Sequence, residues 1–251
     1  MDLKKFGDYS SSDLNYGLSG SRSREREFEI SEAFPILMRK VYTWMTLALI
    51  ITGFTAYYVA TSPALMGLIF ANKVVFWGLL IAEFALVVGV TAAINRLSLT
   101  MATLMFVLYS IVNGATLSSI CLIYSESSIA SVFFITAGTF AAMAAFGYFT
   151  KTDLSSMGKI LFMALIGIII ATVVNIFMQS SGLAMILNYL GVLVFVGLTA
   201  YDSQKIKEML LMAPDAGEVG QKMALLGALT LYLDFINLFL YLLRLFGDRR
   251  S

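Results

Sequence analysis

Four charged residues lie inside long apolar stretches of the chain, where a charge needs a physical reason. Three are acids, Glu83, Asp202 and Asp234, and one is a base, Arg244. Charged side chains are costly inside a membrane, so those found there usually face a bundle interior or a wet cavity and mark pathways for ions or protons. The chemistry expected of these residues is therefore the handling of protons or cations.

The apolar run that holds Asp234 gathers its polar groups on one side. Successive residues of a helix are turned by about 100°, and the residues that then share an arc with Asp234 are Gly227, Thr230, Asn237, Tyr241 and Arg244. The rest of the circumference is almost wholly Leu, Ile and Phe, with Tyr232 on the opposite side interpreted as ordinary packing. Such a stripe turns toward a bundle interior or a wet cavity. Its alternative role is to hold the bundle together by hydrogen bonds, as Asn237 and Thr230 would.

Asp202 ends the preceding apolar run and shares a helix face with Asn188, Phe195 and Thr199. Spacing alone does not bring it into contact with Asp234. If the two carboxylates meet in a low dielectric, they cannot both ionise easily and would titrate as a unit. Oxygen ligands also suit a hard cation such as calcium. Because the chain has no histidine, the usual switch near neutral pH, a carboxylate pair is the natural substitute.

Glu83 and Arg244 both belong to the outer half of the membrane. Glu83 lies about nine residues from the outer end of its run, roughly 14 Å deep at about 1.5 Å per residue. An unpaired charge at that depth is costly. Their depth allows the two residues to pair, either as part of a pathway or as a structural bridge.

The composition excludes several classes of protein. Of 251 residues, 59% are apolar and 13% are charged, against roughly 25% charged in a soluble domain. The absence of histidine rules out Ser-His-Asp and Cys-His catalysis, and the chain has no phosphate-binding glycine loop. A net charge of +1 gives no reason to expect a nucleic-acid partner. We therefore expect neither an enzyme nor a cofactor.

The elements that must position these residues are membrane-spanning helices. Each apolar run is near the roughly 20 residues that a helix needs to cross a bilayer, and the runs are 41–60, 74–94, 99–123, 129–149, 160–178, 183–200 and 223–243. In hydrocarbon all backbone polar groups must be satisfied internally, so the runs are helices. The sequence predicts an all-α integral membrane protein with a seven-helix domain over 41–247. Residues 1–40 are polar and typical of a disordered cytoplasmic tail.

The distribution of positive charge predicts the orientation. With the amino terminus inside, thirteen of the 17 Lys and Arg residues lie on the inner side. Small residues of the fourth run, Gly138, Ala141, Ala142, Ala145 and Gly147, predict close packing with another helix.

Two segments carry a resemblance to a known family. Residues 196–207, Val-Gly-Leu-Thr-Ala-Tyr-Asp-Ser-Gln-Lys-Ile-Lys, and residues 227–240, Gly-Ala-Leu-Thr-Leu-Tyr-Leu-Asp-Phe-Ile-Asn-Leu-Phe-Leu, resemble the signatures of the last two helices of the Bax inhibitor-1 family. The similarity covers roughly residues 36–247. Short loops and the lack of Asn-x-Ser/Thr sequons suit a bacterial branch, and hence the cytoplasmic (inner) membrane.

The resemblance implies six helices, in two three-helix layers, around a central seventh helix. It also implies that Asp202 and Asp234 share a proton and gate a calcium leak, with calcium as the permeant or bound ion. Glu83 and Arg244 would line the outer part of the pathway. Some relatives latch the helix 6 aspartate with a base, for which Arg96 is the candidate here.

Three functions remain open on the sequence. The leading one is a pH-sensitive calcium leak channel. The second is a non-conducting regulator of another membrane protein, such as a quality-control protease, with residues 1–40 as the contact. The third is a proton-coupled transporter that uses the same carboxylates.

Overall fold

The computed structural model is an all-α bundle and describes residues 11–250, with side chains from residue 32 onward. Within these residues, seven helical segments are long and apolar enough to span a membrane, as predicted. The helices that form them are α1 (Ser11–Thr61), α3 (Lys73–Ala93), α4 (Leu99–Leu117), α6 (Glu126–Phe149), α7 (Ser155–Met178), α8 (Ser181–Leu211) and α9 (Glu218–Phe246). Short helices occupy two of the connections: α2 (Pro63–Met66), η1 (Gly67–Ala71) and α5 (Ile120–Ile123).

The helix that holds the first candidate span continues toward the amino terminus before residue 41. Among the residues whose side chains are described, the candidate span within α1 is Glu32–Thr61. Ala33, Leu37 and Val41 are buried at intervals of four residues, so they form one apolar face that packs into the bundle. Residues 1–10 lie outside the described part of the chain, and the role of a tail over 1–40 stays a prediction.

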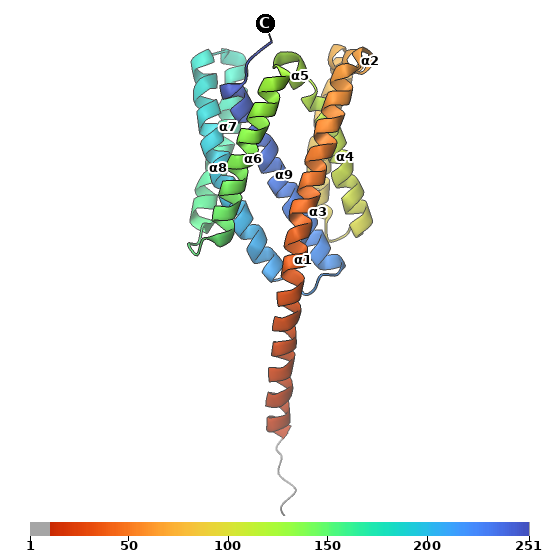
Figure 1. Ribbon diagram of the computed structural model, residues 1–251, viewed down its shortest axis with the longest axis vertical. Helices are drawn as coiled ribbons and strands as arrows, with labels where there is room; N and C mark the ends of the chain where they lie inside the picture. Colours follow the sequence, from red (N-terminus) through yellow and green to blue (C-terminus); the bar gives the residue numbers. More distant parts are fainter. Residues whose placement is uncertain (1–10, 251) are drawn as a thin grey trace, which may run out of the picture.

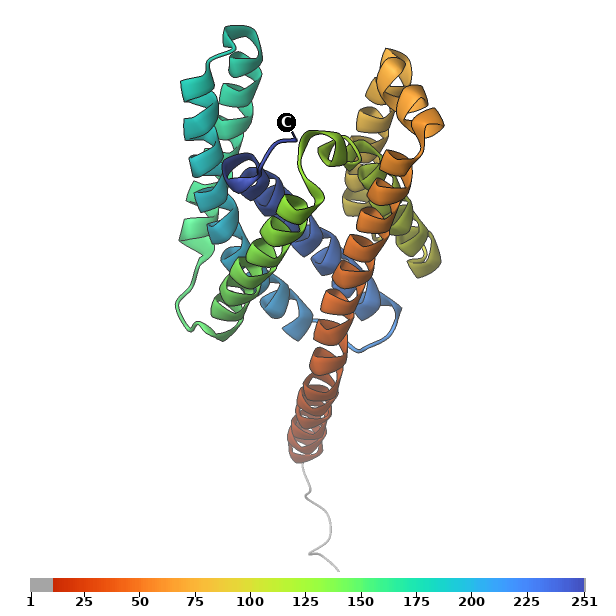
Figure 2. The ribbon, with the colours of Figure 1, turned by 45° about the horizontal axis from the view of Figure 1, so that its top comes forward.

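The helices form two groups with α9 between them. In one group α1 packs on α4 and α4 on α3, and in the other α8 packs on both α6 and α7. α9 runs obliquely between the groups and contacts α1, α4, α6 and α8 (Figures 1 and 2). It is the most buried spanning helix, with 67% of its apolar segment inside the bundle against at most 39% for the others.

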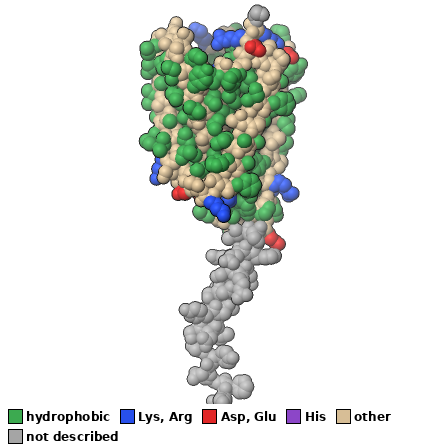
Figure 3. Space-filling view, turned by 60° about the vertical axis from the view of Figure 1, so that its left-hand side comes forward, with side chains coloured by type: hydrophobic (Ala, Val, Ile, Leu, Met, Phe, Trp, Pro, Cys, Tyr) green, Lys and Arg blue, Asp and Glu red, His purple; other side chains and the backbone are tan. Residues whose placement is uncertain are grey.

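The surface of the bundle matches a bilayer. On the face shown in Figure 3, apolar side chains cover the middle, and charged side chains gather toward the two ends. Large apolar residues exposed along the helices include Trp77, Phe84, Phe134 and Phe177. Only lipid can satisfy such a belt, so the chain is a multi-pass membrane protein.

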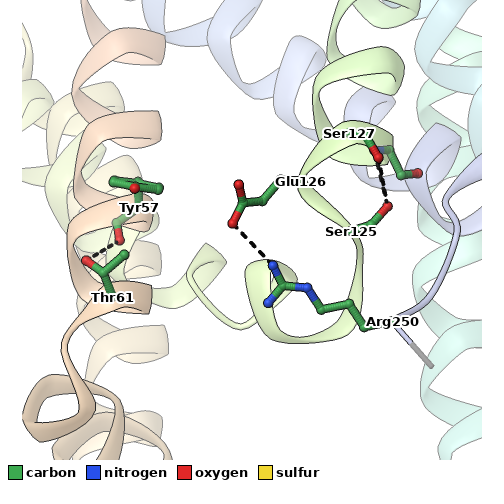
Figure 4. A network of polar contacts seen from close by, with 7 residues as sticks. Tyr57, Thr61, Ser125, Glu126, Ser127 and Arg250 are labelled. Atoms are coloured by element: carbon green, nitrogen blue, oxygen red, sulfur yellow. Dashed lines mark hydrogen bonds and ion pairs between the residues drawn. The ribbon is translucent and has the colours of Figure 1, made fainter.

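The carboxyl terminus lies at the end of the bundle opposite to the start of α1 (Figure 1). There it pairs with the junction of α5 and α6: the Arg250 amide donates to the Ile123 carbonyl at 2.9 Å, and the Ser125 amide to the Asp248 carbonyl at 3.1 Å. The Arg250 guanidinium also bonds the Glu126 carboxylate at 3.2 Å (Figure 4). α9 therefore crosses the whole bundle. The inside location of the amino terminus stays a prediction.

The close packing predicted for the small residues of α6 is confirmed at one of the two glycines. A methyl group on Gly147 would run into the carbonyl oxygen of Ala200 in α8, so only glycine permits this approach. A methyl group on Gly138 would meet nothing.

These two glycines allow a matched test of the packing of α6 on α8. We expect Gly147→Ala to lower the free energy of unfolding by about 1–3 kcal/mol, because the added carbon must push two helices apart. Gly138→Ala should leave it unchanged or slightly raised. Denaturation of both variants in mixed micelles measures the difference. Equal stabilities would contradict the close contact at Gly147.

Candidate functional site

α8 carries three consecutive polar residues, Asp202, Ser203 and Gln204, whose side chains face different neighbours. The Ser203 hydroxyl donates to the Ala144 carbonyl of α6 at 2.8 Å. The Gln204 side-chain oxygen accepts from the Leu154 amide, in the connection between α6 and α7, at 2.8 Å. These bonds fix the rotation of α8 on α6, and Asp202 consequently lies in a cavity shared with α7 and α9.

The structure brings Asp202 and Asp234 together. Both side chains line one cavity at the interface of α8 and α9, close enough for the two carboxyl groups to act on one another. Asp234 is only 5% exposed, and its Oδ2 atom has no hydrogen-bond partner within the described chain. A hydrogen bond between the two carboxyl groups would require that one of them carry a proton. The structure thus places the two side chains in one cavity, which spacing alone did not predict.

The pair lines a cavity of about 610 Å³ between α7, α8 and α9, which we call the inner cavity. Its polar walls come from all three helices, and they are Lys159, Tyr201, Asp202, Lys205, Thr230, Asp234, Asn237 and Tyr241. Carboxylate, amide and hydroxyl oxygens thus face the same space as two lysines. Such oxygens are ligands for hard cations.

A second cavity of about 450 Å³, the outer cavity, continues the same side of α9. Arg244, Arg249, Asn175 and Asn188 contribute to its walls. Tyr241 lines both cavities, and its ring stacks on Phe195 with the ring centres 5.8 Å apart. The polar stripe predicted for α9, from Thr230 to Arg244, therefore runs along these two cavities.

The predicted pairing of Glu83 with Arg244 is wrong. Glu83, in α3, faces Asn113 and Thr116 of α4, whereas Arg244 lines the outer cavity beside α7 and α8. No ion pair joins them in the described part of the chain, where Oε1 of Glu83 is buried without a hydrogen-bond partner. Equal depth does not fix the direction in which a side chain points. A role for Glu83 in a pathway stays a prediction.

Tyr232 does more than pack. Its hydroxyl donates to Oδ1 of Asn113 at 3.1 Å and lies 2.7 Å from the hydroxyl of Thr52, which also donates to the Ser110 carbonyl at 3.0 Å. The side chain is fully buried, and Tyr109 packs edge-on against its ring. The interpretation as ordinary packing was therefore wrong, because this residue ties α9 to α1 and α4 by hydrogen bonds.

Arg96 does not reach Asp202 in this structure. It is exposed in the turn between α3 and α4, away from the helices that line the inner cavity. Lys205, one turn beyond Asp202 on α8, is the cation whose charge acts on that carboxylate. Arg96 belongs to the group of α1, α3 and α4, whereas Asp202 belongs to the group of α6, α7 and α8. The predicted latch and its target are therefore in different groups.

Sequence reasoning missed the residues that hold α8 on α6. Besides Ser203 and Gln204, Lys207 donates from Nζ to the Tyr148 carbonyl at 2.7 Å. The available signal was the polarity of residues 203, 204 and 207 beside Asp202 at the end of an apolar run.

Within the described residues, no group of three or more His, Cys, Asp or Glu side chains is placed to hold a metal ion. Two carboxylates with neighbouring amide and hydroxyl oxygens offer fewer charged ligands than a tight calcium site uses. The donor set around Asp202 and Asp234 is therefore smaller than that of a tight calcium site.

Comparisons with known proteins agree with the geometry. Residues 35–251 match the family model described as inhibitor of apoptosis-promoting Bax1. Inner membrane protein YbhL of Escherichia coli (strain K12) is 53% identical over 215 residues, which cover 85% of this chain and 92% of that protein. An uncharacterized protein of Borreliella burgdorferi is 47% identical over 214 residues, with the same two shares covered. Uncharacterized protein RP147 of Rickettsia prowazekii is 42% identical over 231 residues, 91% of this chain and 95% of its own.

The match extends over all seven spanning helices and includes both motifs that carry the aspartates. The chain therefore belongs to the Bax inhibitor-1 family, among bacterial members such as YbhL, and is a multi-pass protein of the inner membrane.

Proposed function

We propose that this protein is a pH-sensitive calcium leak channel gated by a proton that Asp202 and Asp234 share. The observation that carries the proposal is the juxtaposition of the two carboxyl groups inside a cavity that is also lined by oxygen-bearing side chains. Membership of the Bax inhibitor-1 family supports it, because the two motifs that resemble this family, residues 196–207 and 227–240, contain Asp202 and Asp234.

The shared proton follows from electrostatics. At an effective dielectric of about 20, two like charges about 4 Å apart repel by roughly 4 kcal/mol. The second ionisation is then harder than the first by about three powers of ten. The pair consequently changes charge in separate steps, one of which opens or closes the pathway.

The pathway follows the polar stripe of α9. A cation entering the inner cavity passes Lys205, meets the oxygens of Asp202, Asp234 and Asn237, and is stopped by the stacked rings of Tyr241 and Phe195. The outer cavity, with Arg244, begins on the far side of Tyr241. Movement of this ring is the step that we propose joins the two cavities.

The aspartate pair is tested by calcium flux into liposomes that contain only this protein, measured across pH. Asp202→Asn and Asp234→Asn keep volume but remove the charge, so each should flatten the pH dependence, and the double variant should resemble either single one. If each single variant lost half of the pH dependence and the double variant lost all of it, the two aspartates would be independent sites. Full wild-type titration in both single variants would refute the gate. Absence of any wild-type flux would leave the non-conducting regulator as the better account.

Asp153→Asn is the matched control, since it makes the same change in the exposed connection between α6 and α7. Hydrogen bonds from Ser155, including one from its amide at 2.8 Å, hold the pKa of Asp153 below its ordinary value. The group therefore stays ionised throughout a neutral pH range, and its stability contribution would be lost only as the pH falls through that lowered value. Flux in Asp153→Asn should follow the wild type at every pH.

The barrier at Tyr241 gives a separate prediction. Tyr241→Ala removes the ring that lines both cavities, so calcium flux should rise several-fold and depend less on pH. Tyr189→Ala, at an exposed position of α8, should leave the flux unchanged. If folded Tyr241→Ala protein conducts as the wild type does, the barrier lies elsewhere.

A further inference from the structure

α1 and α6 leave a groove between them on the side of the bundle away from the inner cavity. Two cavities, of about 680 and 360 Å³, lie along it and share Leu49, Phe133 and Phe235. α1 supplies one wall, α6 the other, and Phe235 of α9 forms part of the floor. The groove therefore extends along the length of α6 and along residues 35–57 of α1.

The walls of the groove are lined by small and apolar residues. On α6 they include Ala137, Ala141 and Ala145, and on α1 they include Gly53 and Ala56. Ala141 and Ala145 are exposed, and a methyl group on Gly53 would meet nothing, so no described part of this chain fills the space. In a bilayer such a space cannot stay empty, and apolar walls favour hydrocarbon over water.

The two ends of the groove differ in polarity. Where α1 enters the bundle, Arg39, Tyr42 and Tyr148 line one end of the groove, and Phe34 stacks on the ring of Tyr148. Lys207 adds a second positive charge, with Nζ 5.1 Å from the centre of the Tyr148 ring.

At the opposite end, α5 approaches α1, and Glu126 is paired there with Arg250. Among the residues whose side chains are described, positive charge without an ion-pair partner thus marks one end of the groove only. Charged side chains gather at the ends of the apolar surface (Figure 3), so we expect this end to lie near the lipid headgroups.

We propose that the groove binds one anionic phospholipid of the leaflet at the end of the bundle where α1 enters it. Its phosphate lies against Arg39, with the side chains of Tyr42 and Tyr148 beside it, and an acyl chain fills the space between α1 and α6. A transmembrane helix of a partner would not need a basic mouth, so the charge favours a lipid. The bound chain touches Phe235, the neighbour of Asp234 on α9.

Native mass spectrometry of the full-length protein tests the site, with phosphatidylglycerol and phosphatidylethanolamine of equal chain length as the probes. The wild type should retain one phosphatidylglycerol in preference to phosphatidylethanolamine. Ala141→Phe places a ring in the groove and displaces about two methylenes, so binding of both lipids should weaken about tenfold. Ala142→Phe, one residue along α6 at an exposed position outside the groove, should bind as the wild type does.

The headgroup is tested separately by Arg39→Gln, which should lower the preference for phosphatidylglycerol about fivefold while the binding of phosphatidylethanolamine is kept. Arg96→Gln, an exposed arginine away from the groove, is its control. Equal binding by Ala141→Phe and Ala142→Phe, or an unchanged preference in Arg39→Gln, would overturn the proposal. So would a wild-type dimer that Ala141→Phe dissociates, because a second copy would then cover the groove. A thermal melt of each variant shows whether it is folded. If Ala141→Phe does not fold, Arg39→Gln still tests the site.

Discussion

The arrangement of this bundle depends on keeping the Asp234 carboxyl group away from hydrocarbon. An isolated charge in the apolar interior is among the most expensive groups a membrane protein can hold, so its helix must be enclosed by others. α9 accordingly runs between two groups of helices and is the most buried of the seven spanning segments. The second carboxyl group, Asp202, then supplies the neighbour that a buried acid needs, provided that one proton remains between them.

Two polar clusters hold α9 on different sides, and they differ in kind. Around Tyr232, hydroxyl, amide and backbone groups satisfy one another and fix the position of the helix against α1 and α4. Around Asp234, Oδ2 remains without a partner and the wall opens into a cavity. A satisfied network adds rigidity, whereas a partly satisfied one beside a cavity can gain or lose a proton or an ion. The first cluster thus fixes α9 against α1 and α4, whereas the second leaves a buried oxygen atom without a partner beside a cavity.

The sequence predicted the spanning helices because the thickness of a bilayer imposes a length and a composition on each. It also predicted the stripe on α9, since the rotation per residue is nearly constant along a helix. It did not predict which neighbouring helix each polar side chain faces. Glu83 was expected to meet Arg244 at the same depth but faces Asn113 and Thr116 instead, because the rotation of each helix is set by its packing. The contacts of Ser203 and Gln204 with α6 were missed for the same reason, since they depend on which neighbour lies beside α8.

The proposed gate requires that Asp202 and Asp234 together hold one shared proton. Infrared difference spectroscopy of the protein in membranes, recorded while the pH is changed, measures it directly through the carbonyl stretch of a protonated carboxyl group. A shared proton should give one such band near neutral pH, which disappears when the pair ionises. The band should be shifted or lost in both Asp202→Asn and Asp234→Asn and retained in Asp153→Asn. Two bands that are each lost with one variant alone, or no protonated carboxyl group at neutral pH, would contradict it.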